Sequence, residues 1–151
     1  MAGDIEILLV DDNAEDVELT VRALRRQRAP GAIHVVRDGE EALDFLFCRG
    51  AHASRSFDHP PRLVLLDLKM PKLDGIEVLR ALRADPRTRV IPVAILTSSK
   101  ETRDLVEGYR LVVNAYVQKP VGSDDFRSVV EQLGAFWLEL NQPPPRAAFG
   151  A

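Results

Sequence analysis

The sequence predicts an α/β protein built on a doubly wound parallel sheet. Five short, strongly apolar segments alternate with five segments of helical periodicity. Such alternation implies parallel strands joined by right-handed crossovers, with helices on both faces of the sheet. The central segment, residues 63–66, contains only apolar residues before Asp67, as is typical of a strand buried on both faces.

The elements follow in order along the chain. Strands are predicted over residues 5–10, 33–36, 63–66, 90–96 and 114–118, and helices after residue 13, from 38, from 75, over 100–111 and over 123–141. Asn13 and Ser123 are predicted N-caps, and Asp38–Glu41 and Ser98–Glu101 predicted capping boxes. Residues 49–62 form an unusually long loop. Residues 1–141 are expected to form one domain, followed by a Pro-rich tail at 142–151 with no output domain.

Composition limits the class of protein. The chain has 151 residues, of which 46% are hydrophobic and 28% charged, enough for one domain with a substantial core. A net charge of −3 gives no reason to expect nucleic acid or membrane as a partner. The single Cys48 excludes an internal disulfide, and neither a signal peptide nor a membrane-spanning run is present. The expected location is the cytoplasm.

Polar residues end four of the predicted strands. Asp11 and Asp12 follow the first, Asp67 the third, Thr97 the fourth and Lys119 the fifth. Because the carboxyl ends of parallel strands share one edge, where open α/β sheets bind their ligands, these side chains should converge. Each could instead be a turn residue, a cap or a surface lysine, but four coincidences are improbable.

The converging groups suit phosphoryl transfer. Carboxylates packed together resist joint ionisation unless a cation lies among them, and hard oxygen ligands favour Mg²⁺. No His/Cys cluster with zinc-ligand spacing is present in the sequence. Lys119 adds a mobile positive charge and Thr97 a hydroxyl donor for phosphoryl oxygens. Asp67, alone on the central strand, is the best candidate for a nucleophile that forms an acyl phosphate.

These residues resemble the response-regulator receiver domain of two-component signalling. The resemblance spans roughly residues 5–141, and the intervals of 30 residues from Asp67 to Thr97 and 22 from Thr97 to Lys119 fit that family. The matching positions are Asp11-Asp12, Asp67, Met70-Pro71, Asp74-Gly75, Thr97, Tyr116 and Lys119-Pro120. The resemblance implies a flavodoxin-like fold with strand order 2-1-3-4-5, and a phosphoacceptor rather than an enzyme.

The resemblance also assigns roles. Asp67 would accept a phosphoryl group from a phosphohistidine of a sensor histidine kinase. Asp12 would bind Mg²⁺ directly, Asp11 largely through water, Asp67 itself would also be a ligand, and Lys69 would contribute its backbone carbonyl.

Four further positions would respond to the phosphoryl group. Lys119 would bridge to it, through a bond to Pro120 for which cis geometry is accessible. Thr97 would move toward a phosphoryl oxygen and Tyr116 would rotate inward. Without the resemblance, Tyr116 would be read as an ordinary strand aromatic.

The long 49–62 loop and the Pro-rich end resemble small stand-alone regulators paired with phytochrome-type histidine kinases. Output would then pass through a partner or through a homodimer. Phe136, Trp137 and Leu140 extend beyond what a small sheet needs for cover, so they are predicted to contribute to a dimer face; the alternative is that they cap the core.

Three other functions are possible. A phosphatase of the haloacid-dehalogenase type would need an Asp-x-Asp nucleophile motif on the first strand, where this chain has Asp11-Asp12-Asn13. Nucleotide-binding folds would need a Gly-rich phosphate loop, and neither common form is present. A pseudo-receiver that binds partners without phosphorylation would not need the intact set of acidic, hydroxyl and ammonium groups.

Overall fold

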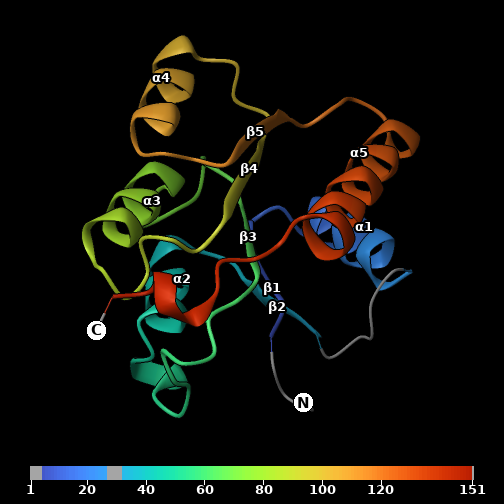
Figure 1. Ribbon diagram of the computed structural model, residues 1–151. Coiled ribbons are helices and arrows are strands. Elements are labelled where there is room, and N and C mark those ends of the chain that lie inside the picture. Colours follow the sequence, from blue (N-terminus) through green and yellow to red (C-terminus); the bar gives the residue numbers. More distant parts are fainter. Residues whose placement is uncertain (1–4, 27–31, 151) are drawn as a thin grey trace.

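A five-stranded parallel sheet lies between two layers of helices in the computed structural model, which describes residues 5–26 and 32–150 (Figure 1). The strand order is β2-β1-β3-β4-β5, with every neighbouring pair parallel. The strands are β1 (Ile7–Val10), β2 (Ile33–Val36), β3 (Leu63–Leu66), β4 (Val93–Thr97) and β5 (Ala115–Gln118). The predicted fold class and strand order are confirmed.

Helices α1 and α5 cover one face of the sheet, and α2, α3 and α4 lie on the other (Figure 1). Alternate strand residues point to opposite faces, so Leu8 and Val10 belong to the core under α2 and α3, whereas Ile7 and Leu9 pack under α1 and α5. The α-helices are α1 (Ala14–Arg25), α2 (Gly39–Leu46), α3 (Gly75–Ala84), α4 (Thr102–Arg110) and α5 (Ser123–Ala135). Within the described ranges, no helix combines the length and apolar character needed to cross a bilayer.

Polar caps explain where several helices begin. The Asn13 side chain accepts from the Asp16 amide (3.0 Å), as predicted. Of the predicted Asp38–Glu41 capping box, the bond from the Glu41 amide to Asp38 forms (2.8 Å), which makes Asp38 the N-cap of α2. A reciprocal capping box at the start of α3 joins Asp74 to Glu77, a pairing that the sequence reading had not singled out.

Two predicted caps are wrong. α4 begins at Thr102 with Glu101 as N-cap, and Ser98 is exposed. α5 takes Gly122 as its N-cap, at a φ of 97° that favours glycine, so Ser123 is instead the first helical residue.

Two element boundaries differ from the prediction by three residues or more. β4 begins at Val93 for two reasons. The Ile91 amide donates a hydrogen bond to the Thr88 carbonyl, which holds Ile91 in a turn, and Pro92 has no amide hydrogen to donate to a neighbouring strand. The last helix keeps its α-helical form only to Ala135. It continues as the π-helix η3, Phe136–Leu140.

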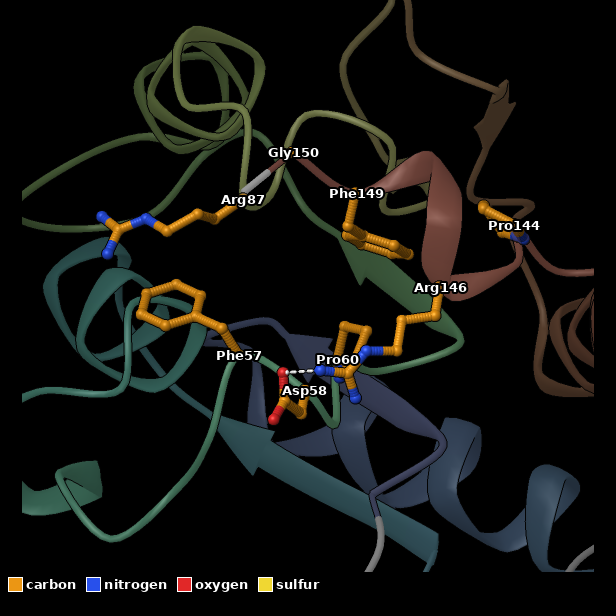
Figure 2. A pocket seen from close by; sticks show the side chains of 8 residues that line it. All are labelled: Phe57, Asp58, Pro60, Arg87, Pro144, Arg146, Phe149 and Gly150. Carbon is orange, nitrogen blue, oxygen red and sulfur yellow. Dashed lines mark hydrogen bonds and ion pairs between the residues drawn. The ribbon is translucent and has the colours of Figure 1, made fainter.

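The C-terminal tail packs against the long loop instead of lying free. That loop contains the 3₁₀-helix η2 (Gly50–His52), and the tail contains η4 (Arg146–Ala148). Arg146 forms an ion pair with Asp58 of the loop, the Gly150 amide donates to the Pro86 carbonyl (2.8 Å), and Phe149 packs against the core (Figure 2). Because these contacts involve loops that precede β3 and β4, the tail crosses the amino edge of the sheet, opposite the predicted site.

Candidate functional site

Three carboxylates meet at the carboxyl edge of the sheet. Asp11 and Asp12 follow β1 and Asp67 follows β3, and one oxygen of each lies within 4.8 Å of the others. Asp11 and Asp67 are buried, with 2% and 6% of their surface exposed, whereas Asp12 is exposed. The predicted acidic cluster is therefore formed, although Asp11 and Asp67 are 56 positions apart in the chain. Asp12 is its solvent-exposed carboxylate.

Lys119 provides the positive charge of this cluster. Its Nζ lies 2.8 Å from Asp11 Oδ2, 2.8 Å from Asp16 Oδ2 and 3.2 Å from Asp67 Oδ2, and only 7% of its side chain is exposed. Burial lowers the pKa of Lys119, but the hydrogen bonds to Asp11 and Asp16 and the nearby charges raise the pKa by more, so the net change is upward. Lys119 is thus held as an ammonium ion.

The other oxygen of Asp67 is held by hydrogen-bond donors. Thr97 Oγ1 donates to Asp67 Oδ1 at 2.6 Å, and the Leu68 amide donates to the same atom at 2.8 Å. Asp67 Oδ2 faces Lys119. The central carboxylate is consequently fixed by neutral donors on one oxygen and by a cation on the other.

Negative charge remains in excess at the site. Burial raises the pKa of Asp11 to about 6; the hydrogen bonds from Lys119 and from the Asn13 amide act against this, and the charge of Asp67 adds to it. One ammonium group faces the carboxylates of Asp11, Asp16 and Asp67. This local excess of carboxylates suits the binding of a hard divalent cation.

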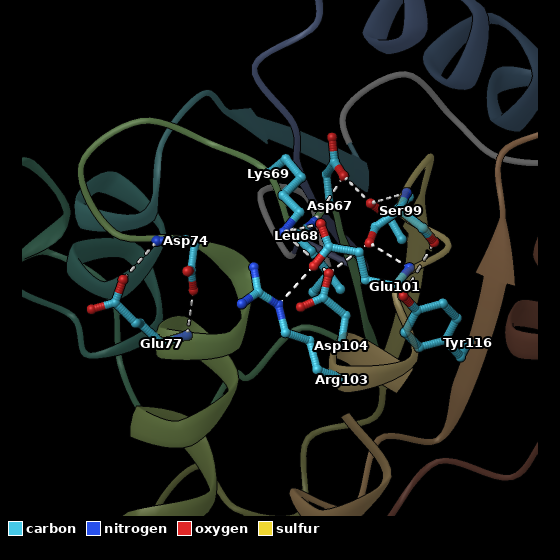
Figure 3. A network of polar contacts seen from close by, with 11 residues as sticks. Asp67, Leu68, Lys69, Asp74, Glu77, Ser99, Glu101, Arg103, Asp104 and Tyr116 are labelled. Atoms are coloured by element: carbon cyan, nitrogen blue, oxygen red, sulfur yellow. Dashed lines mark hydrogen bonds and ion pairs between the residues drawn. The ribbon is translucent and has the colours of Figure 1, made fainter. Parts of the chain in front are cut away.

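A polar network connects the Asp67 loop to α4 (Figure 3). Lys69 Nζ pairs with Asp104 Oδ2 at 3.1 Å, and Ser99 Oγ donates to the same oxygen at 2.6 Å. The Tyr116 hydroxyl donates weakly to the Ser99 carbonyl at 3.4 Å. Tyr116 is therefore half-buried against the β4–α4 loop, where its hydroxyl contacts Ser99, two residues after Thr97.

The structure brings together Asp11, Asp12, Asp67, Thr97 and Lys119, as the strand-end argument predicts. Asp16 was missed, although its position in the first turn of α1 could have indicated a residue near the end of β1. The peptide bond before Pro120 is trans, as are all described peptide bonds, so the cis alternative is wrong. The role of the Lys69 carbonyl in binding a metal stays a prediction.

The predicted dimer face is wrong in one of its members. Trp137 is 8% exposed and packs in the core under α1 and α5, because it lies 11 residues, about three helical turns, after the buried Phe126 and so on the same face. Phe136 and Leu140, at 47% and 72%, are exposed.

Comparison with known proteins identifies the class. The family described as the response regulator receiver domain matches residues 7–131, so the chain belongs to that family. Receiver domains act in two-component signalling, and phosphorylation on an aspartate is implied by membership.

Two of the individual proteins that the chain resembles are covered over most of their length. It is 42% identical over 138 residues to the probable methanogenesis regulatory protein FilR2 of Methanothrix harundinacea, covering 91% of this chain and 86% of that protein. It is 36% identical to the response regulator Rcp1 of Synechocystis, covering 88% of each.

Solved structures support the same class. The phosphorylated cyanobacterial phytochrome response regulator RcpA superposes with a TM-score of 0.86 at 37% identity, over 92% of this chain and 97% of RcpA. The Mn²⁺-bound form of Rcp1 gives 0.85 at 35% identity, over 92% and 98%. The bacteriophytochrome response regulator RtBRR gives 0.71 at 48% identity, over 93% and 84%. The predicted resemblance to phytochrome response regulators is confirmed.

Proposed function

We propose that this chain accepts a phosphoryl group on Asp67 from a phosphohistidine of a sensor histidine kinase, in a Mg²⁺-dependent reaction. The observation that carries the proposal is the setting of Asp67: Thr97 and the Leu68 amide hold one oxygen, and Lys119 faces the other. A carboxylate in this position is a nucleophile with charge-stabilising groups already in place.

The transfer exchanges one bond to phosphorus for another. A carboxylate oxygen of Asp67 attacks phosphorus, the P–N bond to the kinase imidazole breaks, and a P–O bond to Asp67 forms. Lys119 Nζ, 3.2 Å from Asp67 Oδ2, is near enough to pair with an oxygen of the transferred group. The Thr97 hydroxyl, released from Asp67 Oδ1, can donate to another.

The acidic cluster fits a hard cation. Asp11, Asp12 and Asp67 would hold Mg²⁺, together with the Lys69 carbonyl. When bound, Mg²⁺ supplies positive charge that offsets the negative charge of the incoming phosphoryl group. The Mn²⁺-bound form of the similar Rcp1 supports a divalent cation at this kind of site.

Phosphorylation would then be read through the β4–α4 loop. Movement of Thr97 toward the phosphoryl group opens space into which Tyr116 can turn from its weak 3.4 Å contact with Ser99. The chain acts in this proposal as a cytoplasmic phosphoprotein that catalyses its own phosphotransfer and dephosphorylation, not as an enzyme with a separate substrate. Its partner is a kinase of the phytochrome type, with neither nucleic acid nor membrane as target.

Homodimerisation is the proposed output. Exposed apolar side chains cluster on α4 and just after it, at Leu105, Val106, Tyr109 and Val112, each at least 42% exposed. Leu140, the last residue of η3, is a separate exposed apolar side chain, at 72%. Leu140→Glu should lower the mass measured in solution by light scattering, with Glu139→Gln as a control; an unchanged monomeric mass in the wild type, with and without phosphorylation, would contradict the dimer.

The test of phosphorylation uses Mg²⁺ and acetyl phosphate, followed by intact mass. The wild type should gain one acid-stable, base-labile phosphoryl group, and Asp67→Asn should not. Asp124→Asn, which alters a side chain 92% exposed, should label like the wild type. No gain in the wild type would favour a pseudo-receiver, and sustained hydrolysis of a generic phosphate ester would favour a phosphatase.

A further inference from the structure

A second group of potential metal ligands lies on the α2 side of the sheet, away from the phosphoacceptor site. It comprises His34 of β2, Glu41 of α2 and His52 of η2, with one ligand atom of each within 4.8 Å of the others. All three side chains are half-buried. Glu41 lies 7 residues after His34, and His52 lies 11 residues after Glu41. This spacing matches no metal-binding sequence motif, and folding brings the three side chains together.

We propose that His34, Glu41 and His52 form a binding site for a divalent transition-metal ion of the Zn²⁺ class. Two imidazoles and one carboxylate are a donor set that Zn²⁺ uses in proteins, with a fourth position left for water. Imidazole nitrogen suits Zn²⁺ and its neighbours in the transition series, whereas Mg²⁺ prefers oxygen ligands alone. This chemistry separates the proposed site from the acidic cluster around Asp67.

Ring packing positions both histidines. The His34 ring stacks on Phe45 with centroids 4.7 Å apart and an interplanar angle of 17°. His52 meets His34 edge-on at 5.3 Å and Phe45 at 5.1 Å. Burial lowers the pKa of His34, against the nearby Glu41 carboxylate, and the neutral imidazole is the form that a metal requires. The ring contacts thus hold both imidazoles in the group whose ligand atoms lie within 4.8 Å of one another.

The surroundings are acidic. The three ligands line an open cavity of about 500 Å³ together with Asp38, Glu40 and Asp44. Lys72 also lines the cavity, and it is engaged by Asp38 and Glu40 at 3.5 Å each. Arg49 pairs with Asp44 at 3.0 Å from outside the lining. Arg55 is turned onto the Phe45 ring and the backbone, with its Cζ 3.7 Å from the ring centroid. Four carboxylates, counting Glu41, therefore line the cavity with one lysine.

Binding would have a structural consequence. His52 belongs to the 49–62 loop, whereas His34 and Glu41 belong to the edge strand β2 and the helix after it. An ion held by all three would fasten the long loop to the sheet edge. The proposal gives a role to this loop without depending on phosphorylation of Asp67.

The test is a calorimetric titration with Zn²⁺ in excess Mg²⁺, which occupies the acidic cluster. One Zn²⁺ should bind the wild type. His52→Ala or Glu41→Gln should weaken the affinity for Zn²⁺ by about tenfold to 100-fold. His59→Ala, which removes the third histidine of the chain, and Cys48→Ser should leave the affinity unchanged. Asp12→Asn should also have no effect, since Asp12 belongs to the other cluster.

A second readout guards against variants that fold poorly. Zn²⁺ should raise the thermal unfolding midpoint of the wild type and of His59→Ala but not of His52→Ala, because a ligand stabilises only a folded state that binds it. Co²⁺ in place of Zn²⁺ should give visible absorption bands that His52→Ala removes. The proposal is overturned if Zn²⁺ does not bind in excess Mg²⁺, if His52→Ala and Glu41→Gln bind as well as the wild type, or if Asp12→Asn alone abolishes binding.

Discussion

Replacing Asp11 with asparagine should stabilise the metal-free protein near neutral pH. Asp11 is 2% exposed and its pKa is raised to about 6 from the ordinary 3.8, chiefly by burial and against the effect of Lys119. Its ionised form is therefore less favourable in the folded protein than in the unfolded chain. Asparagine has the same shape, and its carbonyl can still accept from the Asn13 amide, which donates to Asp11 at 3.0 Å.

The sign and size of the effect follow from proton binding. Between pH 3.8 and about 6 the folded protein holds more protons at Asp11 than the unfolded chain does, so stability falls as pH rises through this window and is level above it. The gap between the two pKa values corresponds to a ceiling of about 3 kcal/mol. Because Lys119 loses one of its carboxylate partners in the variant, the expected gain at pH 7.5 is about 1–2 kcal/mol.

Urea unfolding at about pH 3.5, 5 and 7.5 in chelator-containing buffer measures the effect. The difference between Asp11→Asn and the wild type should change in favour of the variant as pH rises. Asp12→Asn removes the same charge from an exposed side chain and should stay within about 0.5 kcal/mol of the wild type. A pH-independent difference, or a variant less stable than the wild type at pH 7.5, would refute the reasoning.

Three further substitutions, with one control variant, test the scaffold by urea unfolding. Arg83→Lys should lower the free energy of unfolding by about 2 kcal/mol. The guanidinium donates to four backbone carbonyls and one side-chain amide oxygen, a set that one ammonium cannot satisfy. A loss below about 0.5 kcal/mol would contradict this. Gly75→Ala should cost about 3 kcal/mol and slow labelling by acetyl phosphate, since a Cβ there would lie 2.3 Å from the Asp67 carbonyl oxygen. Gly108→Ala, whose Cβ would meet only side-chain atoms at 3.3 Å or more, is its control and should be neutral or stabilising. Val112→Gly should stabilise by about 0.5 kcal/mol, because Val112 is 67% exposed and holds a φ of 57°; destabilisation would show that its side chain packs usefully.

The residues predicted correctly were those whose position follows from topology alone. Once five parallel strands are recognised, the carboxyl end of each is fixed to one edge. Asp67, Thr97 and Lys119 then have to meet, however far apart they lie in the chain. The hydrogen bond of 2.6 Å between Thr97 and Asp67 is the clearest instance.

The errors lie where side-chain direction depends on local helix geometry. Trp137 lies about three helical turns after the buried Phe126, so helical periodicity places it in the core, whereas the dimer-face prediction counted it as surplus apolar surface. Ser98 has the sequence of a capping box with Glu101, but α4 begins one turn later, with Glu101 as its N-cap, and it is the neighbouring Ser99 that is turned inward to donate to Asp104. Asp16 was missed for the same reason, because its contact with Lys119 depends on how α1 leaves β1.

The excess of carboxylates at the site lowers the stability of the fold, and it also favours binding of the cation that the proposed reaction requires. A third carboxylate partner for Lys119, Asp16, keeps the ammonium charged and directed at the cluster, but one cation does not balance the buried acids, as the raised pKa of Asp11 indicates. Neutralising Asp11 should stabilise the fold while removing a metal ligand, so stability and reactivity are opposed at this residue. Divalent cations should accordingly stabilise the wild type and have less effect on Asp11→Asn, since the ion relieves the repulsion that asparagine has already removed.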